Sequence, residues 1–514
     1  MYIESQLCVQ RLSLPIGSSS CITRMDRNLL GSPRVATNQL YTTTEIRVKY
    51  LERVGLYSHK VNSYVPYIAP LFLADLDNRD AIEARRRLVE ITESNPTRIN
   101  RQPQNGMLAP GSINSSIVNL TTATLGVGTL AIPFVLYNAG LILFFVLLLV
   151  QAWLGFSTIR QIVSALNTTE LHSFEEITCV LFGRMAAVLV EVSILIFCFG
   201  TAVSYHITIG ELGLAICQKV FSSDTVPWYI ASALLTRTGF LCFITSFVLL
   251  PLCLFDKITE LRFTCLIGLG CILATVCVVV YSCFANGLSI DVIDNWSDYL
   301  FPRGFPGVVS ALGVLTFAFC SQPNVPTIFY ELEDRSIDKM THAVSRASVL
   351  CMFVYSVMGL AGVGRFGHAI APSIIDNMAQ EFLLGNPPVV VAYGLLAFAV
   401  CMSFPLNVFP IKLTFEQLFI HGGMSNVPFM SRVVACFVVA FSLVCAIAIP
   451  DVTVIFDMIG TTVGSVICFI LPAAIYLRIL SLSGSVLCRR SRKAWFVFLV
   501  GCVLLMTGAF TSIK

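Results

Sequence analysis

Long apolar runs alternate with short polar connections from about residue 112 to the end of the chain. Each run is close to the ~20 residues that an α-helix needs to cross the apolar part of a bilayer. The pattern predicts eleven transmembrane helices, at residues 112–136, 140–162, 186–218, 238–255, 261–284, 307–330, 340–363, 389–413, 431–449, 452–477 and 494–513. The chain is therefore expected to be an all-α polytopic membrane protein.

The composition agrees with this prediction and excludes several other classes. Of the 514 residues, 56% are hydrophobic and 12% are charged, whereas soluble proteins carry about 25% charged residues. The net charge of +3 is small and gives no indication of a nucleic-acid partner. The 19 cysteines form no Cys-x-x-Cys pair and no cluster with histidine, so neither a metal site nor a cofactor is expected. The sequence shows no pairing of a nucleophile with a base, so an enzyme is not expected.

The first 110 residues form a separate region. They are polar, rich in serine and threonine, and contain a basic run, Arg85-Arg86-Arg87, but no apolar stretch long enough to span a bilayer. We predict that residues 1–110 are a cytosolic, largely disordered tail and that residues 111–514 are the transmembrane domain. The tail is interpreted either as a solvated linker or as a regulatory segment that binds a cytosolic partner.

Basic residues indicate the orientation in the membrane. They are concentrated in the connections that share a side with the tail, for example Arg184, Arg346, Arg432 and Arg490. Because cytosolic connections carry the excess of lysine and arginine, we predict a cytosolic N terminus. The membrane itself is expected to be either the plasma membrane or that of a vacuole or lysosome.

The first apolar run contains residues that a simple spanning helix does not need. Within Asn119–Pro133 lie Gly126, Gly128, Pro133 and several threonines. Glycine and proline weaken the helical hydrogen-bond ladder, and the backbone groups that they free inside a bilayer must find other partners. Taken alone, this segment is either a helix broken to hold a ligand or a close crossing between two helices.

The sixth apolar run repeats the anomaly. Pro323 and Pro326 lie in mid-span, beside Ser321 and Gln322. Interrupted helices at corresponding positions of two five-helix halves are typical of transporters with inverted repeats, which favours the broken-helix interpretation. Half-helix N-termini attract a carboxylate and freed carbonyls attract an ammonium group. A zwitterionic amino acid carries both groups.

Six segments, in order, resemble motifs of the amino acid/auxin permease (AAAP) family, which includes sodium-coupled neutral and vacuolar amino acid transporters. They are Asn119–Pro133 with Asn138-Ala139-Gly140, Val203–Glu211, Leu249–Leu252, Phe317–Leu332, Ser403–Lys412 and Phe469–Pro472. The resemblance covers residues 112–514. It implies a LeuT-like fold of the APC superfamily, a 5+5 inverted repeat of eleven helices in which helices 1 and 6 are broken.

The resemblance also implies a substrate site and a transport function. Thr124, Leu125, Gly126, Val127 and Gly128 match the part of helix 1 that would hold the backbone groups of the amino acid, and Phe317, Ala318, Phe319 and Ser321 match the pocket in helix 6. Tyr205 matches an aromatic residue of helix 3, which either faces the site or packs between helices. The expected function is secondary active transport of amino acids by alternating access.

The coupling ion is expected to be a proton, with sodium as the alternative. Proton coupling needs a titratable group, and the candidates are His206, Glu191 and Asp457. Sodium coupling would use Thr122, where some sodium-coupled relatives have asparagine, and Ser403. A second function remains open, namely an amino-acid sensor that signals through the tail.

Overall fold

The structure is a computed structural model that describes residues 111–169, 171, 173–221, 235–255, 262–333, 335–421, 426–449, 456, 459–482 and 489–512. The predicted tail, residues 1–110, and the candidate Asp457 lie outside these described residues. The described residues all belong to one structural unit, which starts at Gln102.

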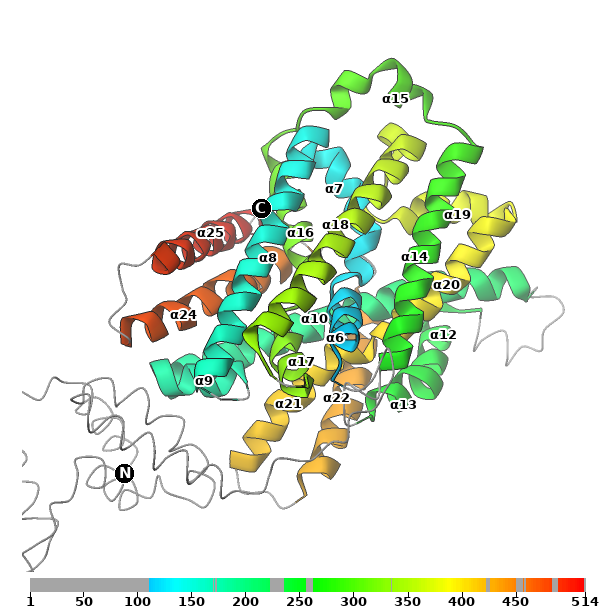
Figure 1. Cartoon of the computed structure of the whole chain (residues 1–514). Helices are drawn as coiled ribbons and strands as arrows, with labels where there is room; N and C mark the ends of the chain where they lie inside the picture. Colours follow the sequence, from blue (N-terminus) through cyan, green and yellow to red (C-terminus); the bar gives the residue numbers. More distant parts are fainter. Residues whose placement is uncertain are drawn as a thin grey trace, which may run out of the picture. The chain divides into compact units, whose positions relative to one another are not determined.

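The regular secondary structure of the described residues is helical, with short connections between the helices (Figure 1). The long helices are α8 (Leu141–Thr169), α10 (Arg184–Val220), α14 (Arg262–Ala285), α16 (Phe305–Ala318) with α17 (Val325–Glu331), α18 (Ile337–Phe366), α20 (Pro387–Ser403) with α21 (Pro405–His421), α22 (Val427–Ala448), the π-helical η9 (Gly460–Gly464) and η10 (Val466–Ile470) with α24 (Leu471–Leu482), and α25 (Arg489–Ser512). Within the described ranges, nine helices are long and apolar enough to cross a bilayer. The bent pair formed by Ile113–Thr124 and Val127–Ala139 makes a tenth.

The predicted fourth span corresponds to a shorter stretch. Arg237–Cys253 is apolar but is made of three short pieces, α12 (Arg237–Ile244), the π-helical η4 (Thr245–Leu249) and α13 (Leu250–Cys253). The prediction of an all-α polytopic membrane protein is confirmed, whereas the count of eleven crossings stays a prediction.

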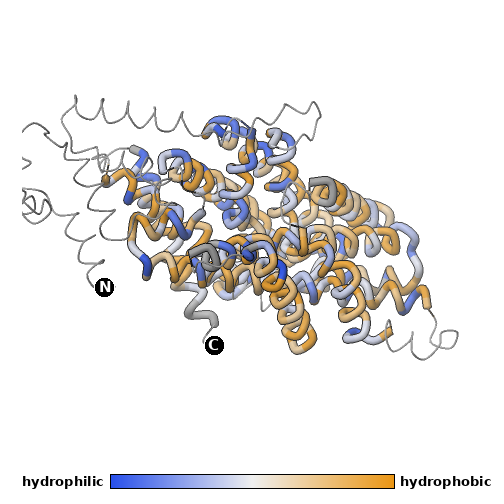
Figure 2. The backbone as a smooth tube through the Cα atoms, turned by 90° about the horizontal axis from the view of Figure 1, so that it is seen from below, coloured by the Kyte–Doolittle hydropathy of each residue, from blue (hydrophilic) through white to orange (hydrophobic). Residues whose placement is uncertain are grey.

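Large apolar side chains lie on the outer surfaces of the helices. Leu189, Phe353, Phe437 and Leu499 are each more than half exposed. A soluble protein rarely exposes this much apolar surface, but lipid chains would cover it. Figure 2 shows the corresponding apolar segments along the helices.

Helix ends follow ordinary capping rules. The N-cap of α18 is Ser336, whose hydroxyl accepts from the N–H of Lys339 at 3.1 Å. Asp338 lies in the first turn and Arg365 in the last turn of this helix, where each charge complements the helix dipole. Helix α18 packs against α6 (Ile113–Thr124) and α7 (Ile132–Ala139).

One glycine of the family motif Asn138-Ala139-Gly140 has a clear structural reason. Gly140 ends α7 at φ 72°, a conformation that favours glycine. A Cβ atom at this position would lie 2.4 Å from the carbonyl carbon of Phe301. The motif therefore allows the connection before α16 to pack against the end of α7, where the N–H of Arg303 donates to the carbonyl of Asn138 at 3.0 Å.

Candidate functional site

The first predicted helix is interrupted at Leu125 and Gly126. Helix α6 ends at Thr124, and Leu125 leaves the helical conformation at φ −79° and ψ 55°. A short 3₁₀ helix, η3 (Val127–Ala131), then leads into α7. The two segments are bent by 49° relative to each other. Carbonyls at the end of α6 and N–H groups at the start of η3 are thus groups that lack a partner within their own helix.

The sixth predicted helix is interrupted in its hydrogen bonding, although it is less bent. Helix α16 ends at Ala318, the one-turn 3₁₀ helix η7 covers Gln322–Asn324, and α17 follows. Pro323 and Pro326 lie in the first turns of η7 and α17, where a missing N–H costs nothing. The prolines therefore start new helical pieces rather than disturbing a continuous one.

The two interruptions lie directly against each other. A Cβ atom added to Gly128 would lie 3.0 Å from the Cβ of Ala318 and 3.1 Å from its Cα. A Cβ atom here would be in an unusually tight contact, so glycine favours this close approach of the two backbones. The structure therefore brings together the two segments that the sequence predicts to share a site.

Tyr355, a residue that the sequence analysis missed, connects both interruptions. Its hydroxyl oxygen is 2.8 Å from the carbonyl oxygen of Thr124 and 2.8 Å from that of Ala318. The side chain is fully buried. The sequence did offer one signal for Tyr355. It places a phenol in the middle of an apolar span, where a polar group needs a specific partner.

Tyr205 from α10 lies beside the first interruption. Its hydroxyl oxygen is 2.1 Å from the place that a Cβ of Gly126 would occupy. The same hydroxyl is close to the backbone of Val127 and to the side chain of Asn407. The Tyr205 hydroxyl thus lies against the first interruption, and its role in a site stays a prediction.

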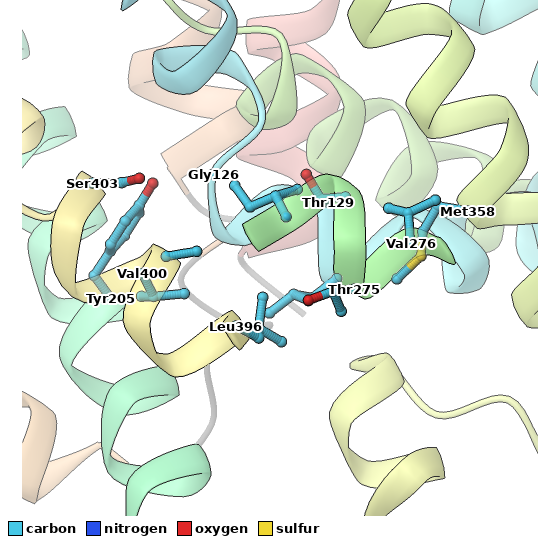
Figure 3. Close-up of a pocket in the computed structure, with 12 residues that line it drawn as sticks. Gly126, Thr129, Tyr205, Thr275, Val276, Met358, Leu396, Val400 and Ser403 are labelled. Carbon is cyan, nitrogen blue, oxygen red and sulfur yellow. The ribbon is translucent and has the colours of Figure 1, made fainter. Parts of the chain in front are cut away.

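A small cavity adjoins Gly126 and Tyr205 (Figure 3). Its volume of about 10 Å³ is roughly that needed for one water molecule, so an amino acid does not fit without movement. No charged side chain lines it; the lining residues are Gly126, Thr129, Leu130, Tyr205, Ile272, Thr275, Val276, Met358, Leu396, Ala399, Val400 and Ser403. Ser403 in this set was predicted as a sodium ligand. The other residues from α14, α18 and α20 were not predicted, because mostly apolar side chains give no sequence signal that separates a pocket from a core.

The predicted residues of helix 6 occupy different surroundings. The ring of Phe317 lies 4.6 Å from that of Phe456 and 6.0 Å from that of Phe197, centre to centre. Phe319 packs edge-on against Tyr355 at 5.2 Å. Ser321 is buried at the start of η7. The rings of Phe317 and Phe319 therefore have different aromatic partners, and Phe319 is the one that packs against Tyr355.

The two sodium candidates both adjoin α14. The hydroxyl of Thr122 donates to the carbonyl of Cys265 at 3.1 Å. Ser403 lies one turn further along α14, with its hydroxyl oxygen 3.6 Å from the Cβ position of Gly268. That oxygen is buried and has no hydrogen-bond partner among the described residues. An unpaired buried hydroxyl is uncommon and calls for an explanation such as an unseen ion or water.

The described proton candidates are held by other groups. The ring nitrogens of His206 lie 3.1 to 3.3 Å from Thr245, Ser442 and the carbonyl of Ala202. Glu191 forms an ion pair with Arg184 at 2.8 Å. Both arrangements are typical of structural polar residues.

A buried carboxyl that the sequence analysis did not select lies outside the spanning helices. Glu175 belongs to the short helix α9 (Phe174–Phe182) and is 8% exposed. The hydroxyl of Thr414 in α21 donates to it at 2.8 Å. Burial raises the pKa of the Glu175 carboxyl above its ordinary value of 4.5.

Comparison with known proteins identifies the family. The model of the family described as "Transmembrane amino acid transporter protein" matches residues 109–514. The chain belongs to this transmembrane amino acid transporter family. The predicted relation to the AAAP family is thereby confirmed, as is the prediction that the protein is not an enzyme.

Two relatives illustrate the range of the family. The chain is 27% identical over 433 residues to sodium-coupled neutral amino acid symporter 2 of Danio rerio, covering 79% of this chain and 83% of the symporter. It is 26% identical over 329 residues to vacuolar amino acid transporter 7 of Saccharomyces cerevisiae, covering 62% of each chain.

A solved structure supports the fold. The chain is similar to a Na⁺-coupled sialic acid symporter, with a TM-score of 0.52, 15% sequence identity, and coverage of 87% of this chain and 95% of the symporter. At this identity the likeness concerns the fold alone, and it supports the predicted LeuT-like architecture.

The contact between Gly126 and Tyr205 predicts the effect of a methyl group. We expect Gly126→Ala to lower amino acid uptake by about tenfold or more, because overpacking costs about 1–3 kcal/mol and 1.4 kcal/mol is a factor of ten. Gly270→Ala in α14, where a Cβ meets nothing within 4 Å, is the matched control. Uptake measured in proteoliposomes should be normal for the control; normal uptake by both variants would show that Gly126 is not in a constrained site.

The raised pKa of Glu175 predicts a pH dependence of stability. In the folded protein the neutral carboxyl is favoured, so its contribution is greatest below pH 4.5 and is lost as the pH rises through the raised folded-state pKa. Relative to the Glu175→Gln variant, the wild type should lose thermal stability as the pH increases. Thermal unfolding across pH, with Glu176→Gln as the control, measures this difference, and parallel curves for wild type and Glu175→Gln would contradict it.

Proposed function

We propose that this protein is a secondary active transporter of neutral amino acids, with the substrate bound between the interrupted helices. The observation that carries the proposal is the direct approach of the two interruptions at Gly128 and Ala318. Both interruptions lie within residues 109–514, which match the model of the amino acid transporter family. We further propose that Arg237–Cys253 completes a set of eleven membrane crossings arranged as a 5+5 inverted repeat.

The chemistry of the interruptions suits a zwitterion. The carbonyls of Thr124 and Ala318 end their helices and can accept from an ammonium group, while the N–H groups from Gly126 to Gly128 can donate to a carboxylate. The small cavity beside them has no charged lining, which favours a substrate with a neutral side chain. The Danio rerio relative is named as a neutral amino acid symporter.

Binding and release require the site to open. The cavity of about 10 Å³ is far smaller than an amino acid, so the described conformation is closed around the interruptions. Movement of α6 and α7 relative to α10 and α20 would enlarge the space between Gly126, Tyr205 and Ser403. Such rocking of one group of helices against another is the usual way in which this architecture alternates access.

Sodium is the coupling ion that the described residues support best. The unpaired hydroxyl of Ser403 and the nearby Thr122, both adjoining α14, can supply oxygen ligands. Proton coupling, expected from the sequence, is the second candidate. It would depend on Asp457, outside the described residues, since His206 and Glu191 are held by hydrogen bonds or an ion pair.

The membrane setting completes the proposal. We propose that the N terminus lies in the cytosol, because the basic connections in the sequence share its side. The host membrane is either the plasma membrane or that of a vacuole or lysosome, the second being the location in the name of the yeast relative.

Uptake into proteoliposomes tests transport and coupling together. We expect labelled neutral amino acids to accumulate when a sodium gradient is imposed, and Ser403→Ala to raise the sodium concentration for half-maximal uptake by about tenfold, as loss of one ligand group costs about 1–3 kcal/mol. Ser356→Ala, whose hydroxyl bonds only within its own helix at Met352, is the control. Uptake driven solely by a pH gradient would favour proton coupling instead.

Removal of residues 1–110 is a second arm of the same experiment. A transporter should retain uptake without the tail, because the described site contains none of its residues. A protein that binds amino acids but never accumulates them, with or without the tail, would instead be a sensor.

A further inference from the structure

The hydroxyl of Tyr355 faces more acceptors than it can satisfy. It lies 2.8 Å from the carbonyl oxygens of both Thr124 and Ala318, yet a phenol carries a single proton. One carbonyl therefore receives a full hydrogen bond, while the other faces either a shared proton or a lone pair.

The backbone near these carbonyls supplies no obvious substitute. The N–H groups of Phe319, Cys320 and Ser321 donate to Leu315, Phe317 and Phe319, and that of Leu125 donates to Thr121. The carbonyls of Thr124 and Ala318 each lie at a helix end, and the donor seen at both of them is the hydroxyl of Tyr355. An acceptor left unpaired in a buried place is costly, so this arrangement favours the arrival of a further donor.

The position of Tyr355 is rigid. Cys351, Tyr355, Gly359 and Gly362 recur every three or four residues along α18, so they share one face of that helix. Cβ positions of the two glycines lie against the α7 residues Ile132, Leu136 and Pro133, which shows that this face packs on helix 1. The ring of Phe319 also packs against the Tyr355 ring, with the ring centres 5.2 Å apart.

We propose that Tyr355 is a positioning residue that holds the two helix-ending carbonyls together and leaves them one proton short, so that the ammonium group of the substrate completes the arrangement. The inference rests on the proposed function and adds a specific determinant of recognition to it. Tyr355 selects for the amino group by orienting the acceptors, and it belongs to α18, which lies outside both interrupted helices.

The variant that removes only the proton donor is Tyr355→Phe. We expect the KM for alanine to rise about tenfold or more, since two carbonyls lose their shared donor, while the maximal rate changes much less. The decisive readout is selectivity, measured as the ratio of the inhibition constants of propionate, which lacks the amino group, and alanine. This ratio should fall about tenfold, an effect that general destabilisation does not produce.

Tyr393→Phe is the matched control. Its hydroxyl is also buried and donates to one backbone carbonyl, that of Ile375, at 2.6 Å, but it lies away from both interruptions. We expect this variant to keep the KM and the selectivity of the wild type. A selectivity within twofold of the wild type for Tyr355→Phe, or an equal loss in Tyr393→Phe, would overturn the inference.

Two further outcomes are separated by design. If Tyr355→Phe is not recovered as folded protein, Tyr355→Gln takes its place. An amide has two N–H donors and can satisfy both carbonyls, so no proton is missing and selectivity should fall about tenfold; selectivity within twofold of the wild type would overturn the proposal. If the wild type itself takes up no amino acid, the proposed function fails, independently of Tyr355.

Discussion

Backbone hydrogen bonding in a medium without water is the constraint on which this structure depends. A continuous helix satisfies its own N–H and C=O groups, so any interruption inside a bilayer must be compensated by neighbouring groups. Two such interruptions lie in the described part of the first and sixth predicted helices, after Thr124 and after Ala318. The close approach at Gly128, the tyrosine hydroxyls of α10 and α18, and the prolines that begin η7 and α17 all serve this compensation.

The interruptions also explain why charged side chains are unnecessary at the candidate site. Helix ends carry partial charges of both signs, and a zwitterion matches them without a buried lysine or carboxylate. A buried, isolated charge is expensive, whereas helix ends already exist once the chain is interrupted. The charged residues that are buried in the described chain lie elsewhere, such as Lys412, whose ammonium group donates to the carbonyl of Phe255 at 2.6 Å near the end of α13.

Much of the fold could be predicted from the sequence because its signals are local. A run of about 20 apolar residues and a mid-span Gly or Pro can each be recognised without knowing the neighbours. The predicted positions of the interruptions at Gly126 and near Ser321 agree with the ends of α6 and α16. The apolar helix predicted at residues 238–255 coincides with Arg237–Cys253, but its division into three short pieces around the π-helical η4 has no distinct sequence pattern.

The candidate site was predictable only in part, since its other members depend on packing between distant helices. Gly126 and Gly128 stand out along the chain, but the role of Tyr355 follows from distances to Thr124 and Ala318, which lie 231 and 37 residues away in sequence. His206 shows the reverse case. A lone histidine in a span suggested a titrating role, yet it links α10 to Thr245 and to Ser442 of α22.

A structure of the protein with a bound neutral amino acid tests the central claim most directly. The account predicts density for the substrate between the two interruptions, with its amino group at the carbonyls of Thr124 and Ala318 and its carboxylate at the N–H groups from Gly126 to Gly128. A second cavity, of about 390 Å³, lies beside the start of α6. Glu333, Lys339 and Arg346 also line it, and it offers an alternative location for the substrate. Substrate density there, with the interruptions unchanged and empty, would contradict the account.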